Sequence, residues 1–368
     1  MIRLRNLKVH LFWKIYLPTL LCLIVYNEYL IHVFHSLQWA QIECQTDNCL
    51  KILLVADPQI LGNTFDTKLY WPLANFDSDR HLAITYRHAV QHSMPDIICF
   101  LGDLMDEGSV ADADQYEEYF QRFANIFPQP TAHTSMIYIP GDNDIGGEGF
   151  EPVKDTNVQR FRQYFNERPF WMFPNAIQIF NVNRITRAAI WNENVENNDR
   201  SSLIFFISHI SLLKHADSYT LKTIEQFQPD VIFSAHDHTS KYTIVRKNVP
   251  EVEPVFVPLS TSRETRHSIS SFNLEEIRNN HGLLEISVPT CSYRMGVMKI
   301  GYGFAVLDGE TLSYTVLWTS QRFYQLAFYS LLIIPLKLLC GQIWCNLLKR
   351  YWCCCRSRNR DYLPLHVG

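Results

Sequence analysis

Five short apolar runs, each followed within two residues by an acidic or imidazole side chain, constrain this chain more than any other feature. The runs are Ile52–Ala56, Ile97–Leu101, Met136–Pro140, Leu203–Ser208 and Val231–Ser234. Continuous apolar runs of this length, bounded by turn residues, are typical of strands that are buried on both faces. The polar residues that follow them are Asp57, Gln59, Asp103, Asp142, Asn143, Asp144, His209, His236 and His238. Because sites in open α/β sheets lie at the carboxyl ends of strands, we expect these side chains to meet at one edge.

The segments between the runs predict the rest of the fold. Amphipathic stretches predict helices at Asp79–Ser93, Asp114–Phe127, Val158–Phe165 and Tyr219–Phe227. Alternating residues within Pro169–Trp191 indicate strands or a hairpin. Further strands are expected at Tyr242–Val245, Val255–Pro258, Gly282–Val288, Gly303–Leu307 and Leu312–Thr319. This order predicts an α/β (α+β) fold, in which a two-layered β-sandwich is flanked by helices and carries the polar side chains at one edge.

Both ends of the chain carry an apolar stretch with basic residues on its outer side. The stretches lie near Leu11–Phe34 and Phe323–Leu348, and each is roughly the 20 residues that a helix needs to cross a bilayer. Basic flanks favour the cytoplasm. We therefore predict a cytoplasmic N-terminus and membrane helix over 1–35, a lumenal domain over 36–320, a second membrane helix over 321–348 and a basic, Cys-rich cytoplasmic tail over 349–368. A cleaved signal peptide and an interfacial amphipathic helix are the respective alternatives.

Cysteine placement and net charge narrow the class of protein further. Cys44 and Cys49 are close enough in the chain to form a disulfide in an oxidising lumen, with two unpaired thiols as the alternative. Cys99 lies within a predicted strand, where a core residue is expected. The cluster Cys353–Cys355 beside basic residues is typical of palmitoylation. A net charge of −4 without a basic stripe excludes a nucleic-acid partner.

The polar residues at the strand ends are of the types that bind divalent metal ions. Carboxylates, amide oxygens and imidazoles suit manganese, iron and zinc, and the lack of thiolates argues against a structural zinc site. Asp103 follows the central run and is the natural bridge between two ions, which in such pairs lie about 3.5–4 Å apart. Two metal ions of this kind support in-line attack on phosphorus.

In this order the motifs resemble the calcineurin-like metallophosphoesterases across about residues 50–310. ADPQILG at 56–62, FLGDLMDEG at 100–108, IPGDNDIG at 139–146 and VPTCSYRMG at 288–296 are similar to the membrane-bound metallophosphoesterase one branch. That branch comprises the phosphodiesterases that remodel GPI anchors and their fungal cell-division relatives. The resemblance implies a lumenal catalytic β-sandwich held between two membrane segments.

The resemblance also implies two metal sites. It makes Asp57, Gln59, Asp103 and His238 ligands of the first ion, and Asp103, Asp142, His209 and His236 ligands of the second. Manganese is the ion that it implies for both. Gln59 stands where many relatives have histidine, and it still offers a neutral oxygen.

Several residues depart from the family pattern. Where the family has Gly-Asn-His-Asp, this chain has Gly141–Asp142–Asn143–Asp144. Asp142 keeps an oxygen ligand and adds a negative charge. Asn143 replaces the histidine that faces the scissile phosphate, and losing a positioned general acid costs about 10²–10⁴ in rate. We place Asn143 and Asp144 in the catalytic positions.

Four other residues near the motifs have open roles. His215 is a possible substitute acid or an exposed loop residue, and Arg294 either contacts substrate phosphate or forms a structural ion pair. Asp106 and Glu107 either orient ligands or begin the following helix.

The resemblance implies a di-metal phosphodiesterase that removes ethanolamine phosphate from a GPI-anchor mannose. Its partners would be the GPI lipid or GPI-anchored proteins, in a multi-pass protein of the endoplasmic reticulum or Golgi membrane that assists their export. The Asn143 departure motivates an alternative, a catalytically weak or inactive metal-binding receptor or scaffold for GPI-anchored cargo. A soluble secreted phosphatase would require that neither apolar end is a membrane anchor.

Overall fold

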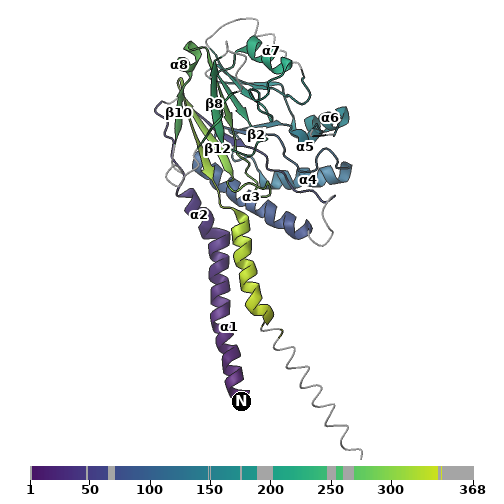
Figure 1. Cartoon of the computed structure of the whole chain (residues 1–368), viewed down its shortest axis with the longest axis vertical. Helices are drawn as coiled ribbons and strands as arrows, with labels where there is room; N and C mark the ends of the chain where they lie inside the picture. Colours follow the sequence, from purple (N-terminus) through teal and green to yellow (C-terminus); the bar gives the residue numbers. More distant parts are fainter. Residues whose placement is uncertain are drawn as a thin grey trace, which may run out of the picture. The chain divides into compact units, whose positions relative to one another are not determined.

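Two β-sheets stacked face to face carry the helices on their outer faces in the computed structural model (Figure 1). The residues described are 2–46, 49–64, 71–147, 149, 151–174, 176–188, 202–246, 254–259, 269–338 and 341. The chain divides into two compact units, residues 31–321 and a terminal unit of residues 1–30 with 322–368.

The first sheet has six strands in the order β10-β13-β12-β1-β2-β3. Its strands are β1 (Leu50–Val55), β2 (Ile97–Leu101), β3 (Ser135–Ile139), β10 (Ser270–Asn273), β12 (Gly301–Asp308) and β13 (Thr311–Trp318). Strands β1, β2 and β3 run parallel, whereas β12 pairs antiparallel with both β1 and β13. The carboxyl ends of the three parallel strands therefore share one edge.

The second sheet has seven strands in the order β4-β5-β6-β7-β11-β8-β9. Its strands are β4 (Phe170–Phe173), β5 (Ile177–Asn181), β6 (Leu203–Ile207), β7 (Val231–Ser234), β8 (Lys241–Arg246), β9 (Val257–Pro258) and β11 (Gly282–Ser287). Strands β5, β6, β7 and β11 are parallel. Two isolated β-bridges lie beyond the ends of the strands, and they pair Ala56 with Thr290 and Ile60 with Met105.

Alternation along the strands fills the space between the sheets and the space under the helices. In β2, Cys99 and Leu101 face the core between the sheets, while Ile98 and Phe100 face the helices. This double burial explains why the strands read as unbroken apolar runs. Helices α3 (Trp71–Ser93), α4 (Ala113–Ile126) and α6 (Asp155–Phe165) pack their apolar side chains on the first sheet, and α7 (Ser218–Phe227) packs on the second.

The two-sheet fold predicted from the sequence is confirmed, with differences at the ends of elements. Helix α3 begins at Trp71 rather than Asp79. The prediction was wrong there because the first two turns point apolar residues outward, with Leu73 and Phe76 about two-thirds exposed while Asn75 is buried. Strand β10 and the short helices α5 (Asp142–Ile145) and α8 (Leu274–Asn279) were not predicted.

The N-terminal apolar segment is helical throughout. It comprises α1 (Ile2–Val25), a π-helical turn η1 (Tyr26–Leu30) and α2 (Ile31–Ser36). Among the described residues, Trp13–Ser36 is the one helical stretch that is long and apolar enough to cross a membrane. Residues 322–338 are also helical, but most of 339–348 and the tail with Cys353–Cys355 lie outside the described residues.

Buried polar contacts join the two helices of the terminal unit. Arg322 forms an ion pair with Glu28 at 2.9 Å, and the hydroxyl of Tyr329 donates to the same carboxylate at 2.7 Å. Asn27, which is fully buried, donates to the carbonyl of Gln325. These contacts hold the segment around η1 against the start of the helix over 322–338.

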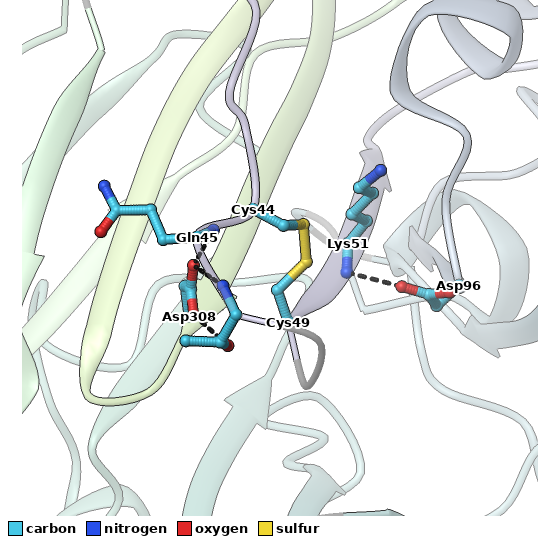
Figure 2. Close-up of a disulfide and its surroundings, with 7 residues drawn as sticks. Cys44, Gln45, Cys49, Lys51, Asp96 and Asp308 are labelled. Carbon is cyan, nitrogen blue, oxygen red and sulfur yellow. Dashed lines mark hydrogen bonds between the residues drawn. A yellow bond between two sulfur atoms is a disulfide. The ribbon is translucent and has the colours of Figure 1, made fainter.

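A disulfide between Cys44 and Cys49 precedes the first strand (Figure 2). Asp308, at the end of β12, accepts hydrogen bonds from the backbone of Gln45 and Thr46 beside the disulfide. Lys51 at the start of β1 donates its backbone N–H to Asp96 at 2.9 Å. Of the two alternatives for these cysteines, the structure has the disulfide, and Cys99 is a buried core residue as expected.

Candidate metal centre

The side chains that follow the parallel strands meet at one edge of the sandwich. Asp57 follows β1, Asp103 follows β2, and Asp142 follows β3 in the first sheet. His209 follows β6 of the second sheet, and His236 and His238 follow β7. Ligand atoms of Asp103, Asp142, His209 and His236 all lie within 4.8 Å of one another.

The backbone at this edge is strained in a consistent way. Asp57, Gln59, Asp103, His236 and His238 all have positive φ angles, between 41° and 65°. Residues with side chains avoid this left-handed region, and such strain clusters at functional sites. Each of these residues turns the chain sharply at the end of a strand, which directs its side chain into the cluster instead of along the strand.

The carboxylates of the first sheet form the buried half of the cluster. Asp57, Asp103 and Asp142 are each at most 3% exposed. Oδ1 of Asp57 lies 3.8 Å from Nε2 of His238 and 3.9 Å from Nδ1 of His209. Asp57 and His238 therefore lie next to the tighter group of four ligand atoms, on the side where the family resemblance implies the first ion.

Two amide side chains bind the central carboxylate. Nε2 of Gln59 donates to Oδ2 of Asp103 at 3.2 Å. Asn143 donates twice to Asp103, from its backbone N–H to Oδ1 at 3.0 Å and from Nδ2 to Oδ2 at 3.1 Å. The structure thus places Asn143 as a residue that orients Asp103, with its amide directed at a ligand.

Asp144 braces the loops that carry the ligands. Its fully buried carboxylate accepts backbone hydrogen bonds from Leu104, Met105 and Gly141, at 2.9 to 3.1 Å. Leu104 and Met105 directly follow Asp103, and Gly141 directly precedes Asp142. Asp144 therefore ties the loop after β2 to the loop after β3, and we regard it as a positioning residue.

Two glycines permit this close approach of the loops. A Cβ on Gly102, whose φ is 90°, would lie 2.6 Å from Nδ1 of His209. A Cβ on Gly141 would lie 2.1 Å from Oδ1 of Asp103. Larger residues at either position would displace a ligand side chain, so the Gly-Asp pairs in the two motifs have a steric cause.

The histidines of the second sheet form the more open half. The side chain of His209 is 2% exposed, that of His238 is 24% exposed and that of His236 is 37% exposed. Nδ1 of His209 lies 2.8 Å from the carbonyl oxygen of Leu101, so it donates its proton there. This bond leaves Nε2 facing Asp142 at 2.9 Å, in the tautomer that a metal ligand needs.

The electrostatics of the cluster favour a bound cation. Burial raises the pKa of Asp57 to about 8, that of Asp144 to about 7 and that of Asp103 to about 6. Burial also acts to lower the pKa of His209, but Asp103, Asp142 and Asp57 raise it well above its usual value. Burial acts to raise the pKa of Asp142, but contacts with His209 and His236 hold it well below its usual range. Packing this many acids together has a charge cost that a divalent cation offsets.

Unpaired ligand atoms show that the residues present fit such a cation. Both carboxylate oxygens of Asp57 are buried without a hydrogen-bond partner. Nδ1 of His236 and Nε2 of His209 face each other at 3.2 Å, and Nδ1 of His236 lies 3.2 Å from Oδ1 of Asp142. Carboxylate and imidazole are ligands for manganese, iron and zinc, and together with Gln59 they form the complete set implied by the resemblance.

The four residues with open roles all lie in loops. His215 is exposed and lines a cavity of about 540 Å³ together with His236, Arg184, Lys214 and Asp237. Glu107 is buried and accepts hydrogen bonds from Thr64 and Tyr119, and helix α4 begins only at Ala113. Glu107 and Asp106 therefore do not begin that helix. Arg294 is half-buried in the loop after β11.

The sequence interpretation missed an ion-pair network beside the histidines. Asp237, between His236 and His238, pairs with Lys214 at 3.1 Å and also with Lys241. Lys214 lies five residues after His209, and Lys241 lies three residues after His238. The network joins the loop that carries His209 to the loop that carries His236 and His238. In the sequence, the only indication of a different role for Asp237 is its place between two ligand histidines.

Comparison with known proteins identifies the family. A family model described as calcineurin-like phosphoesterase matches residues 50–240, which contain all of the predicted ligands. The metallophosphoesterase 1 homologue of Drosophila melanogaster is 28% identical over 150 residues, covering 40% of this chain and 39% of that protein. The corresponding protein of Caenorhabditis elegans is 32% identical over 154 residues, covering 40% of this chain and 37% of that one.

Cell division control protein 1 of Saccharomyces cerevisiae is 23% identical over 267 residues, covering 68% of this chain and 53% of that protein. The chain thus spans about half or less of the length of these relatives. Taken with the two-sheet fold and the acid and histidine cluster at its edge, the family match shows that the chain belongs to the calcineurin-like phosphoesterases, which are metal-dependent.

Proposed function

We propose that this protein is a membrane-bound phosphodiesterase that removes ethanolamine phosphate from a mannose of GPI anchors in the secretory pathway. Two divalent metal ions, most simply manganese, would occupy the candidate centre. The GPI lipid or GPI-anchored proteins would be the substrates, and their export from the endoplasmic reticulum would be the process assisted.

The observation that carries the proposal is the convergence of ligands from both sheets on one edge. Three buried carboxylates and three histidines meet there, and several of their ligand atoms have no hydrogen-bond partner. Divalent cations held by these groups supply Lewis-acid activation of a phosphate ester and of the attacking water. Similarity to proteins named metallophosphoesterase 1 supports a phosphate ester as the substrate.

The protein's own residues fix the geometry for this chemistry. Asp103 is positioned by Gln59 and Asn143, and Asp144 holds the loops on either side of it. His209 is oriented by the Leu101 carbonyl, while His236 and His238 are reachable from solvent. The substrate therefore approaches from the histidine side, and the acid side excludes water.

The membrane part of the proposal has independent support. The helix over Trp13–Ser36 has the length and composition of a membrane span. The buried Glu28–Arg322 ion pair joins the two terminal helices, as expected if both enter the membrane together. The Cys44–Cys49 disulfide near the start of the domain favours an oxidising lumen for residues 36–320.

One observation favours a second candidate, a metal-binding receptor or scaffold with weak turnover. The backbone N–H and the Nδ2 amide of Asn143 both donate to Asp103, and an amide is too weak an acid to protonate a leaving group. Without a proton donor there, hydrolysis of esters with poor leaving groups would be about 10²–10⁴ slower. In this alternative the centre binds phosphate esters and releases them unchanged.

The test uses the full-length chain in lipid nanodiscs, loaded with manganese and supplied with a purified GPI glycolipid that carries ethanolamine phosphate. We expect mass spectrometry to show a product lighter by one ethanolamine phosphate group. Asp103→Asn should abolish the product, and Asp114→Asn, an exposed acid on α4, should not. Binding of the glycolipid without any product would support the receptor alternative.

A further inference from the structure

Two cavities of different chemical character open beside the metal centre, each next to a different ligand histidine. The first, of about 540 Å³, contains His236 and is lined by charged residues such as Arg184, Lys214 and Asp237. The second, of about 520 Å³, contains His238 and is lined mainly by apolar side chains. Both volumes lie within the range that holds small ligands.

The apolar cavity, which we call the His238 groove, is formed by four segments, and its polar residues are His238–Lys241 and Lys299. Its apolar lining consists of Pro258 and Leu259 at the end of β9, Val297 and Met298 in the loop before β12, and Trp318 at the end of β13. Met298 is 63% exposed. Exposed apolar side chains that gather in a concave surface commonly mark a binding site.

One residue of the groove lies close in the chain to an apolar helix. Trp318 accepts a hydrogen bond at its carbonyl from Nε1 of Trp39, at 2.8 Å. Trp39 lies three residues after α2, and Trp318 lies four residues before the helix that starts at 322. The lining of the groove therefore includes both a metal-ligand histidine and the end of the last strand of the domain.

We propose that the His238 groove binds the hydrocarbon chain of an amphiphilic phosphate ester whose phosphate lies at the metal centre. This inference rests on the metal centre of the proposed function and goes beyond its substrate, because ethanolamine phosphate on a mannose carries no hydrocarbon chain on its phosphate. Continuity with His238 argues for a part of the substrate rather than for a separate ligand. A carbohydrate in the groove would leave its apolar lining unused.

The two cavities together predict how such an ester is oriented. A polar or charged substituent suits the cavity beside His236, where Lys214 and Asp237 form an ion pair. The hydrocarbon substituent suits the groove beside His238. Burying it there removes apolar surface of both partners from water, which stabilises the complex in proportion to the area buried.

The test measures binding and turnover separately. Isothermal titration calorimetry would give Kd values for methyl, butyl and hexyl phosphate with the manganese-loaded, full-length chain in nanodiscs, after subtraction of empty nanodiscs. Hydrolysis of bis(p-nitrophenyl) phosphate, in which water replaces one p-nitrophenolate on phosphorus, would be followed on the same samples. The first readout tests the groove, and the second tests the proposed activity.

We expect Kd to fall by at least about tenfold from methyl to hexyl phosphate, since each added methylene that enters the groove leaves water. Met298→Gln, alone and with Val297→Thr, should remove most of this dependence and leave the Kd of methyl phosphate unchanged. Met172→Gln is the matched control, because Met172 on β4 is 58% exposed and lies outside the groove.

Equal Kd values for the three phosphates would overturn the groove proposal, whether or not the diester is hydrolysed. The groove proposal is also overturned if Met172→Gln weakens hexyl phosphate binding as much as Met298→Gln does. Chain-length dependence without hydrolysis would support the groove and count against the phosphodiesterase activity. Failure of the groove and failure of the activity are therefore distinguishable.

Discussion

The acid half and the histidine half of the metal centre come from different sheets and differ in burial. The carboxylates of Asp57, Asp103 and Asp142 are nearly inaccessible, and buried hydrogen bonds to Asp144 brace the loops of Asp103 and Asp142. The histidines become progressively more exposed from His209 to His236. Two cavities open on the histidine side, one beside His236 and the other beside His238.

This difference indicates a division of roles. The buried carboxylates determine whether a metal ion is bound. Their loops have little freedom to rearrange, and leaving their charges without a cation has a high free-energy cost. An accessible set of imidazoles can contact metal and substrate together. Substitutions on the acid side should therefore affect metal binding and folding, and substitutions around the histidines should affect mainly substrate binding.

The largest expected effect is that of Asp103→Asn. This substitution removes the charge of the central carboxylate, so we expect the manganese affinity and the hydrolysis rate to fall by more than the ~10–100-fold loss seen for residues that only support ligands. Metal content of the purified variant and its rate on bis(p-nitrophenyl) phosphate measure the two effects. A variant that kept both values within about twofold of the parent would break the assignment of Asp103.

The next largest effect is a difference in stability between two variants, Asp144→Ala on the acid side and Asp237→Ala on the histidine side. Asp144→Ala leaves three buried backbone N–H groups without partners and should lower the free energy of unfolding by about 2–5 kcal/mol. Asp237→Ala removes more exposed ion pairs and should cost at most about 1 kcal/mol. Denaturant unfolding of both metal-free variants measures the difference, and equal losses would contradict the division of roles.

The pH dependence of metal binding should reflect the acid side. Burial raises the pKa of Asp57 to about 8, so at lower pH the metal must displace a proton. We expect manganese affinity to rise by about tenfold per pH unit between pH 6 and pH 7 for each proton released. A pH-independent Kd, measured by calorimetry in two buffers, would show that the carboxyl is already ionised.

The metal-free protein should show the opposite trend in stability. The pKa values of Asp57 and His209 are both raised in the folded state. Their contribution to stability is complete below their unfolded values and is lost as pH rises through the folded values. Melting temperatures should therefore fall from pH 5 to pH 8 without manganese, and the stabilisation by added manganese should grow over the same range.

The smallest expected effect is that of Lys214→Gln on the histidine side. Lys214 is 45% exposed, and its ion pair with Asp237 should contribute less than about 1 kcal/mol. We expect unchanged metal affinity and a changed KM for esters with a charged substituent. A loss of bound manganese in this variant would show that the lysine supports the ligands themselves.

The sequence predicts the ligand positions better than it predicts their supports. Apolar runs ending in Asp or His indicate where strands stop, and parallel pairing brings those ends to one edge, so the members of the cluster follow from local pattern. The group that orients His209 is the backbone carbonyl of Leu101, and the sequence cannot indicate it because every residue has such a carbonyl. Likewise, the bonds from Asp144 to Leu104 and Met105 depend on tertiary packing, and the sequence interpretation placed Asp144 in a catalytic position.

The start of α3 shows a similar limit in the fold. Leu73 and Phe76 point away from the core there, so the pattern that marks a buried helix face is absent. The strands were predicted more accurately because both of their faces are buried. Burial on both faces gives a continuous apolar run, which can be recognised without any periodic pattern of polar and apolar residues.

The most direct test of the proposed activity is manganese-dependent hydrolysis of bis(p-nitrophenyl) phosphate by the full-length chain, with Asp103→Asn and Asn143→His beside it. We expect turnover in the parent, none in Asp103→Asn and faster turnover in Asn143→His, which restores the histidine of the family pattern. A parent that binds manganese without turnover, together with activity gained only in Asn143→His, would contradict the phosphodiesterase proposal and favour a metal-binding receptor.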